Sequence, residues 1–327
     1  MPYYLHASVV LFQSTLYRVD GDFVKSESTI RDFMFKGPQP ETRRDRALQG
    51  RLHISQLDNK IRVYDRNAAS FIYRWEAEQP LSSLEMEVTS RLQGVAARYF
   101  QSIGDFEAAR ASLEQFLSLD SSSPIRANTR RLLIGRLADL YCETEEYAKV
   151  VDILQPELDS ITAPDRSRRP FRRLMLALVE ANIGLDRLQS AELLIQDLGE
   201  YSAPLELDNL HDQQLHMRRL LAVARIAHMR SGNHHQAVLS WSFCLKEVAQ
   251  MHTLKAKGGF TAAMIYLSLA RAQLGVGNED DARNSWAAGT EILRSEKCEF
   301  WIPIVPTIWL RKIATEVYEL RGNPILE

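Results

Sequence analysis

The sequence has few cysteines and lacks the residue spacings that bind metals. Its 327 residues include three cysteines, Cys142, Cys244 and Cys298, which are far apart in the chain. This sparse, odd set provides no disulfide framework and no Cys-x-x-Cys pair, and it is typical of a reducing compartment. His211 and His216 are five positions apart, so they would not share a helix face as two zinc ligands do. We therefore expect no metal and no cofactor.

Sequence signatures of catalysis are also missing. The chain has no Gly-x-Ser-x-Gly nucleophile motif and no Gly-Lys-Ser/Thr loop that would cradle a phosphate. The two glycines of Gly275–Asp280 join two expected helices and do not follow a strand, which indicates a simple turn. We therefore assign no catalytic residue.

Neither a strong net charge nor a long hydrophobic run is present. The formal net charge is -2, which gives no attraction to nucleic acid or to an anionic membrane. We interpret the basic clusters Arg43–Arg46 and Arg166–Arg173 as solvated loops and helix starts; a nuclear signal or a phosphate patch is the alternative. The apolar run Phe300–Leu310 is short and contains two prolines. The sequence predicts a cytoplasmic protein without a membrane span, with a nuclear location as the alternative.

The sequence does contain an internal repeat. Turns between expected helices start at residues 21, 62, 104, 145, 186, 232 and 277, which gives steps of 41, 42, 41, 41, 46 and 45 residues. Five residues after each turn start stands a mostly small residue: Ser26, Asn67, Ala109, Val150, Ala191, Ala237 and Ala282. Nine residues after it stands a large apolar residue: Ile30, Phe71, Leu113, Leu154, Ile195, Trp241 and Trp286. Seven residues before it, small residues recur: Ser14, Ser55, Ala97, Ala138 and Ala270.

Each of these recurring positions has a physical explanation. A Gly-Asp or Gly-Asn pair, as at Gly104-Asp105, ends one helix in a left-handed cap and starts the next helix. A small residue lets two antiparallel helices approach closely, and the large apolar residue fills the space between neighbouring hairpins. The pattern therefore predicts a series of stacked helical hairpins.

This order of residues resembles the tetratricopeptide repeat (TPR), in the long-period variety found in kinesin-light-chain-like arrays. The resemblance spans about residues 3–296 and is clearest in Gln93–Pro124. It implies an all-α, right-handed solenoid of about seven antiparallel hairpins in a single superhelical domain over residues 1–327. We expect the hairpins at about 3–36, 42–78, 82–119, 125–160, 170–200, 205–253 and 260–296. We expect the segment 303–327 to form a helix that covers the exposed face of the last hairpin.

In the family that the chain resembles, the first helices of the hairpins line a concave groove that binds peptides or partner helices. The register places one set of charged residues on this face or its margins: Arg91, Arg98, Arg136, Asp139, Arg173, Arg219 and Arg271. Arginine suits the recognition of carboxylates and phosphates through its planar fork. The alternative is that these arginines pair locally, as Arg98 could with nearby acids. The family's clamp for chaperone tails uses Asn where Arg98 stands, which argues against such a ligand.

The sequence therefore predicts a non-catalytic scaffold or adaptor. Its partner would be a protein or peptide, acidic or phosphorylated if the arginines line the groove, and neither nucleic acid nor a membrane. One alternative is a structural subunit of a larger assembly, bound through the ends or the convex face. Another is an enzyme with its site inside the superhelix, for which His53, His228, Glu180 and Arg98 are the polar candidates. The oligomeric state stays open.

Overall fold

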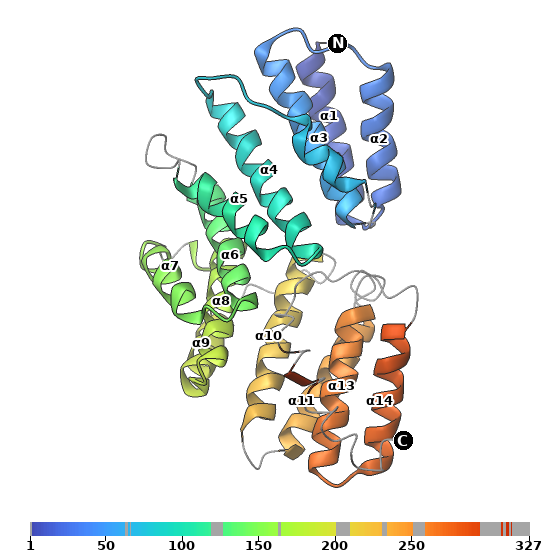
Figure 1. Cartoon of the computed structure of the whole chain (residues 1–327), viewed down its shortest axis with the longest axis vertical. Coiled ribbons are helices and arrows are strands. Elements are labelled where there is room, and N and C mark those ends of the chain that lie inside the picture. Colours follow the sequence, from blue (N-terminus) through green and yellow to red (C-terminus); the bar gives the residue numbers. More distant parts are fainter. Residues whose placement is uncertain are drawn as a thin grey trace. The chain divides into compact units, whose positions relative to one another are not determined.

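In the computed structural model, all the regular secondary structure among the described residues is helical. The structure describes residues 2–62, 65, 67–118, 127–162, 165–200, 210–230, 234–250, 259–294, 309, 312–313 and 315. Among these residues there is no β-strand, and successive helices form antiparallel pairs (Figure 1). The prediction of an all-α fold built from helical hairpins is confirmed. None of the described helices combines the length and the apolar character needed to cross a bilayer.

The chain divides into two compact units, residues 1–140 and 141–327. Unit 1 holds α1 (Tyr3–Val19), α2 (Phe23–Lys36), α3 (Arg43–Arg62), the 3-10 helix η1 (Ala68–Arg74), α4 (Ser83–Ser102) and α5 (Phe106–Ser118). The boundary falls within α6 (Ala127–Glu143). Unit 2 holds α7 (Tyr147–Asp159), α8 (Arg169–Gly184), α9 (Leu188–Glu200), α10 (Leu210–Met229), α11 (His234–Gln250), α13 (Gly259–Gly275) and α14 (Glu279–Arg294). A single domain over 1–327 stays a prediction.

The small residues of the repeat lie where two helices contact each other. Five residues after the turn start, Ser26, Ala109, Val150, Ala191, Ala237 and Ala282 are each 0% exposed. In the first hairpin, serines take the place of the usual small apolar pair, and the Oγ atoms of Ser14 and Ser26 are 2.7 Å apart. Asn59 of α3 donates from Nδ2 to the Ser26 Oγ at 2.9 Å, so the buried hydroxyls are satisfied.

The second hairpin departs from the predicted pattern. In place of a second α-helix within 42–78, the structure has the short 3-10 helix η1. Asn67, at the small-residue position, is exposed rather than buried. Trp75, directly after η1, lies against α3, where a Cβ added to Gly50 would come within 2.4 Å of the indole. The contact of Trp75 with α3 therefore holds the chain after η1 against the first helix of the hairpin.

Five of the seven predicted turn starts adopt the left-handed conformation that the repeat predicts, whereas Arg62, the second of them, is the last residue of α3. The φ angles of Gly21, Gly104 and Gly277 are 80°, 81° and 78°. At the equivalent positions of the fourth and fifth hairpins, Glu145 and Asp186 have φ angles of 62° and 57°. These two hairpins therefore keep the turn geometry without glycine, in a region that L-residues adopt at a cost. The turn start at residue 232 lies outside the described residues.

Replacing Glu145 with glycine should raise the free energy of unfolding by about 0.5–1 kcal/mol. A left-handed L-residue costs about 1–2 kcal/mol, and the extra freedom of glycine in the unfolded chain offsets part of the gain. Asp186→Gly should gain less, because aspartate tolerates this region better. Chemical denaturation measures both variants. The reciprocal control is Gly104→Ala, whose new Cβ would meet nothing within 4 Å. An unchanged stability for Gly104→Ala would contradict the assigned backbone strain.

Candidate functional site

In unit 1, the first helices of successive hairpins bring charges together across one repeat period. Helix α1 packs against α3, and α3 packs against α4. Arg18 of α1 donates from Nη1 to the Oδ2 of Asp58 on α3, at 3.3 Å. Arg98 of α4 donates from Nη1 to Oδ1 of the same carboxylate. Arg62, one turn after Asp58, donates from Nε to Oδ2 at 3.3 Å. We call these four residues the Asp58 cluster.

The Asp58 cluster holds three guanidinium groups around one carboxylate. The side chains of Arg18, Arg62 and Arg98 are 18%, 12% and 28% exposed, and that of Asp58 is 13% exposed. Burial alone would raise the pKa of Asp58, but the surrounding guanidinium groups hold that pKa well below its ordinary value. Burial and the neighbouring arginines Arg62 and Arg91 lower the pKa of Arg18. The formal charges of these four residues sum to +2.

Three of the predicted groove residues lie at or beside this cluster. Arg98 belongs to it, and its pairing with Asp58 is the local ion pair that the sequence left as an alternative. The charge of Arg91 acts on Arg18, and its Nη2 lies 3.2 Å from Glu87. Arg136 of α6 donates to the backbone carbonyl of Gly94, and its charge lowers the pKa of Asp58. The structure therefore brings Arg91, Arg98 and Arg136 into one neighbourhood around Asp58, each with a contact to the protein itself.

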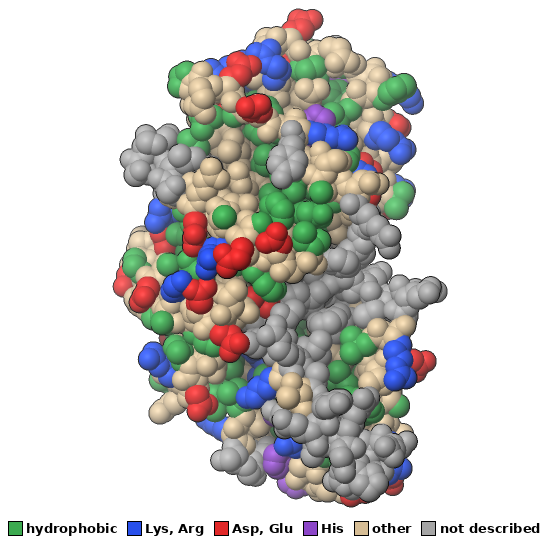
Figure 2. Space-filling view, viewed as in Figure 1, with side chains coloured by type: hydrophobic (Ala, Val, Ile, Leu, Met, Phe, Trp, Pro, Cys, Tyr) green, Lys and Arg blue, Asp and Glu red, His purple; other side chains and the backbone are tan. Residues whose placement is uncertain are grey.

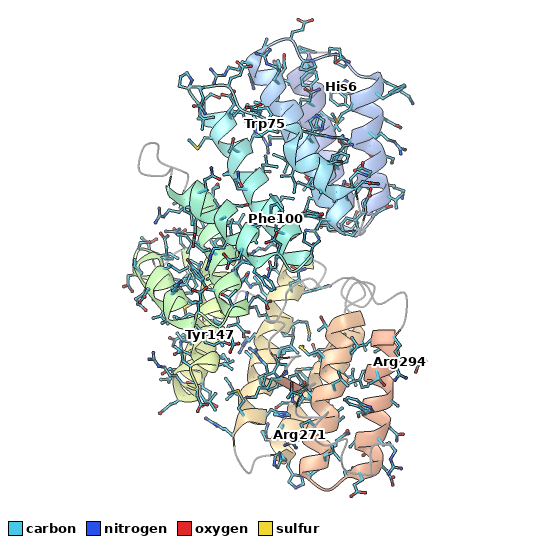
Figure 3. All side chains as sticks on the ribbon, viewed as in Figure 1. His6, Trp75, Phe100, Tyr147, Arg271 and Arg294 are labelled. Carbon is cyan, nitrogen blue, oxygen red and sulfur yellow. The ribbon has the colours of Figure 1, made fainter. Side chains whose placement is uncertain are left out.

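The other predicted groove residues have different surroundings. Asp139 is partly buried on α6, and Arg173 is partly buried near the start of α8. Arg219 of α10 lies beside the end of α9, where its Nη2 would be 3.3 Å from a Cβ on Gly199. Arg271 of α13, labelled in Figure 3, lowers the pKa of His228 of α10. Within unit 2, Arg219 and Arg271 therefore have different neighbours.

Two arginines of the basic clusters lie at helix starts with side chains 38% and 44% exposed, and each also forms an ion pair with the next hairpin. Arg43 begins α3 and donates to Glu85, whose side chain is 2% exposed, with an Nη2–Oε2 distance of 2.6 Å. Arg169 begins α8 and forms a two-point contact with Asp212 at 3.0 and 2.9 Å. Each carboxylate lies in the first turn of the next first helix, so it also complements that helix dipole. These arginines therefore tie successive hairpins together.

Unit 2 contains a more deeply buried ion pair. Arg225 of α10 donates from Nη2 to the Oε2 of Glu180 on α8, and their side chains are 3% and 1% exposed. The Nε of Arg218 lies 3.9 Å from the other oxygen of Glu180. Tyr147 of α7, labelled in Figure 3, lies against Gly184 at the end of the same helix. Glu180 is therefore enclosed by protein, and the contacts around it are those of a structural group.

The described surface carries charges of both signs. Figure 2 shows acidic and basic side chains intermixed over the described part of the visible face. Among the described residues, no group of three or more His, Cys, Asp or Glu side chains could hold a metal ion. Burial, together with Arg74, lowers the pKa of His53. The Asp58 cluster is thus the candidate site that combines excess charge with partial exposure.

Comparison with known proteins supports the fold. No protein-family model matches this sequence, and no curated protein matches it. Among solved structures, the chain is similar to a crystal structure of Rap protein complexed with competence and sporulation factor. The TM-score is 0.66 with 12% sequence identity, over 99% of this chain and 85% of that chain. At this identity the likeness concerns the fold alone, and it supports a TPR-type helical repeat.

Proposed function

We propose that the chain is a non-catalytic scaffold that binds an extended acidic or phosphorylated segment of a partner protein. The segment would lie along the first helices of unit 1, with the Asp58 cluster as its anchor. The observation that carries this proposal is the cluster's unbalanced charge, three arginines around Asp58 in partly exposed positions. An incoming carboxylate or phosphate would supply the missing negative charge.

Asp58 prepares the cluster for such a ligand. Its two oxygens hold Arg18, Arg62 and Arg98 in place, so less side-chain entropy is lost when an anion binds. The guanidinium groups also have other neighbours, since Arg18 donates from Nη2 to Thr15 Oγ1 at 3.1 Å and Arg62 lies over the ring of Phe23. A ligand would add to these contacts in the bidentate geometry that arginine favours.

The comparison supports a binding role of this general kind. The similar Rap protein was solved in complex with a factor, so a closely related fold accommodates a partner. For this chain, the partner class follows from the Asp58 cluster and from the TPR-like arrangement of hairpins. Arg91 and Arg136 would extend the contact along the segment, and the binding face would correspond to the concave groove expected from the sequence.

A peptide titration tests the proposal. Fluorescein-labelled decaglutamate and a phosphoserine peptide of the same length serve as probes, with a neutral Gly-Ser peptide as the control ligand. Arg98→Gln should weaken binding of both acidic peptides about tenfold, the value of one lost charge-assisted contact of about 1.4 kcal/mol. Raising the salt concentration should weaken the wild-type complex, because exposed charge contacts are screened.

The matched control is Arg44→Gln. Arg44 is an exposed arginine of the same unit, and its guanidinium lies over the ring of Tyr4, 4.6 Å from the ring centre, outside the Asp58 cluster. Its replacement removes the same charge and should leave peptide binding nearly unchanged. Equal losses for Arg98→Gln and Arg44→Gln, or no measurable binding of either acidic peptide, would contradict the proposed site.

A further inference from the structure

A tryptophan from the C-terminal segment is buried among the helices of unit 2. The described residues of this segment are Trp309, Lys312, Ile313 and Thr315, drawn dark red in Figure 1. Trp309 is 4% exposed and Ile313 is 0% exposed. Both belong to the hydrophobic core formed with α10, α11 and α13. The side chains of Trp309 and Ile313 therefore anchor the segment in the core of this unit.

The indole of Trp309 has contacts with the described helices α10, α11 and α13. It stacks on Trp241 of α11, with ring centres 6.2 Å apart and an angle of 22° between the rings. His228 of α10 meets it edge to face at 5.5 Å. Its Nε1–H donates to the Ser268 Oγ of α13 at 3.2 Å. The Arg225 guanidinium lies 5.7 Å from the ring centre. We call these four surrounding residues the Trp309 slot.

The walls of the Trp309 slot are held by contacts that do not involve Trp309. Trp241 donates from Nε1 to the Nδ1 of His228 at 3.2 Å. Ser268 donates to the backbone carbonyl of Met264 at 2.8 Å, and Arg225 is fixed by Glu180. Burial, and then the charges of Arg271, His234 and Lys312, lower the pKa of His228 to about 4. At neutral pH its imidazole is therefore uncharged and can accept the Trp241 bond. The slot is preorganised for an aromatic side chain.

Trp309 contacts the first helices of two hairpins. The terminal helix expected to cover the exposed face of the seventh hairpin stays a prediction, because most of 303–327 lies outside the described residues. The described contacts of Trp309 are with α10 and α13, the first helices of the sixth and seventh hairpins, and with Trp241. First helices are the ones that the TPR resemblance assigns to ligand binding.

We propose that the Trp309 slot is a binding site for an aromatic side chain, and that the chain's own C-terminal segment fills it as an intramolecular competitor. A partner segment that uses the first helices of unit 2 must displace Trp309. The biological meaning of this inference rests on the proposed scaffold function. The slot and its occupant are supported independently by the contacts of Trp309. A tethered segment competes at a high effective concentration, so it closes the site without needing tight intrinsic affinity.

A peptide of residues 303–327, labelled with fluorescein, tests whether the slot exchanges its occupant. The full-length Trp309→Ala variant should bind this peptide at least about tenfold more tightly than the wild-type chain, in which the tethered segment excludes it. The same peptide carrying Trp309→Ala should not bind the variant. The control protein is full-length Trp286→Ala. Trp286 packs against the same core from α14, but its loss leaves the slot filled, so this protein should behave as wild type.

Several outcomes would overturn the inference. Equal peptide binding by the wild-type chain and Trp309→Ala would mean that Trp309 does not close the site. Equal binding of the peptides with and without Trp309 would mean that the indole is not the anchor. A dimeric wild type that the peptide dissociates would place the occupant in a second copy.

A second experiment covers the case in which Trp309→Ala does not fold. A protease site inserted within 296–302 allows the folded chain to be cut, after which labelled peptide should replace the released segment. No exchange after complete cutting would contradict a displaceable occupant. Neither experiment uses an acidic probe or a residue of unit 1, so its failure would leave the proposed function intact. Conversely, a failure of the acidic peptides to bind would leave the proposal for the Trp309 slot unaffected.

Discussion

Replacing Asp58 with asparagine should lower the free energy of unfolding by about 3 kcal/mol, and phosphate should restore much of that loss. The substitution leaves three guanidinium groups, 12–28% exposed, without their common counter-charge. Removing one partner of a buried ion pair costs about 3–5 kcal/mol, and the partial exposure here favours the lower end. The stability is measured by chemical denaturation at neutral pH, where Asp58 is ionised in the native wild-type chain.

The phosphate dependence separates an anion site from a purely structural cluster. An anion that binds only the folded state stabilises it by about 2.7 kcal/mol at one hundred times its dissociation constant. The Asp58→Asn variant carries a larger positive excess, so phosphate should stabilise it more than it stabilises the wild type. Sodium chloride of equal ionic strength is the solution control. Glu107→Gln is the protein control, because the Glu107 side chain is 78% exposed and pairs with Arg110 on the surface. Equal stabilisation of all three proteins by phosphate would contradict a specific anion site.

The sequence predicted the parts of the fold that depend on local spacing. The small residues that repeat, such as Ala109 and Ala237, are at the helix contacts because close approach admits little else. The register also located left-handed turns at Glu145 and Asp186, where no glycine marks them. The shortened second hairpin was not predicted, and the packing of Trp75 on Gly50 is a contact between elements that residue spacing does not show.

The charge clusters were only partly predictable. Arg98 was identified as a site residue, but Asp58 and Arg18 were not. A signal was present, because Arg18, Asp58 and Arg98 follow one another at 40-residue intervals, close to the repeat period. Opposite charges one period apart on neighbouring first helices are candidates for ion pairs between hairpins. Arg43 with Glu85 and Arg225 with Glu180 follow the same rule, at intervals of 42 and 45 residues.

How much such an ion pair contributes to stability depends on how deeply it is buried. That burial could not be derived from the spacing of the residues in the sequence. The Glu180–Arg225 pair is almost completely enclosed, with side chains 1% and 3% exposed. The Glu192–Arg230 pair joins α9 to the residue that follows α10 at 2.5 Å, but its side chains are 35% and 46% exposed. The two pairs share their residue types. They therefore form a matched comparison of a buried and an exposed ion pair.

Arg225→Met should lower the free energy of unfolding by about 3–5 kcal/mol, because it leaves the buried Glu180 carboxylate with only the more distant Arg218. Arg230→Met should lower it by less than about 1 kcal/mol, since water can solvate the exposed Glu192. The double variant Glu180→Leu/Arg225→Met should recover a large part of the loss, because it removes the unpaired buried charge as well as its partner. Denaturation of the wild type, Glu180→Leu, Arg225→Met and the double variant gives the coupling energy. A double variant that is as unstable as the sum of its singles would mean that Arg225 stabilises the chain through other contacts, such as that with Trp309, and not through Glu180.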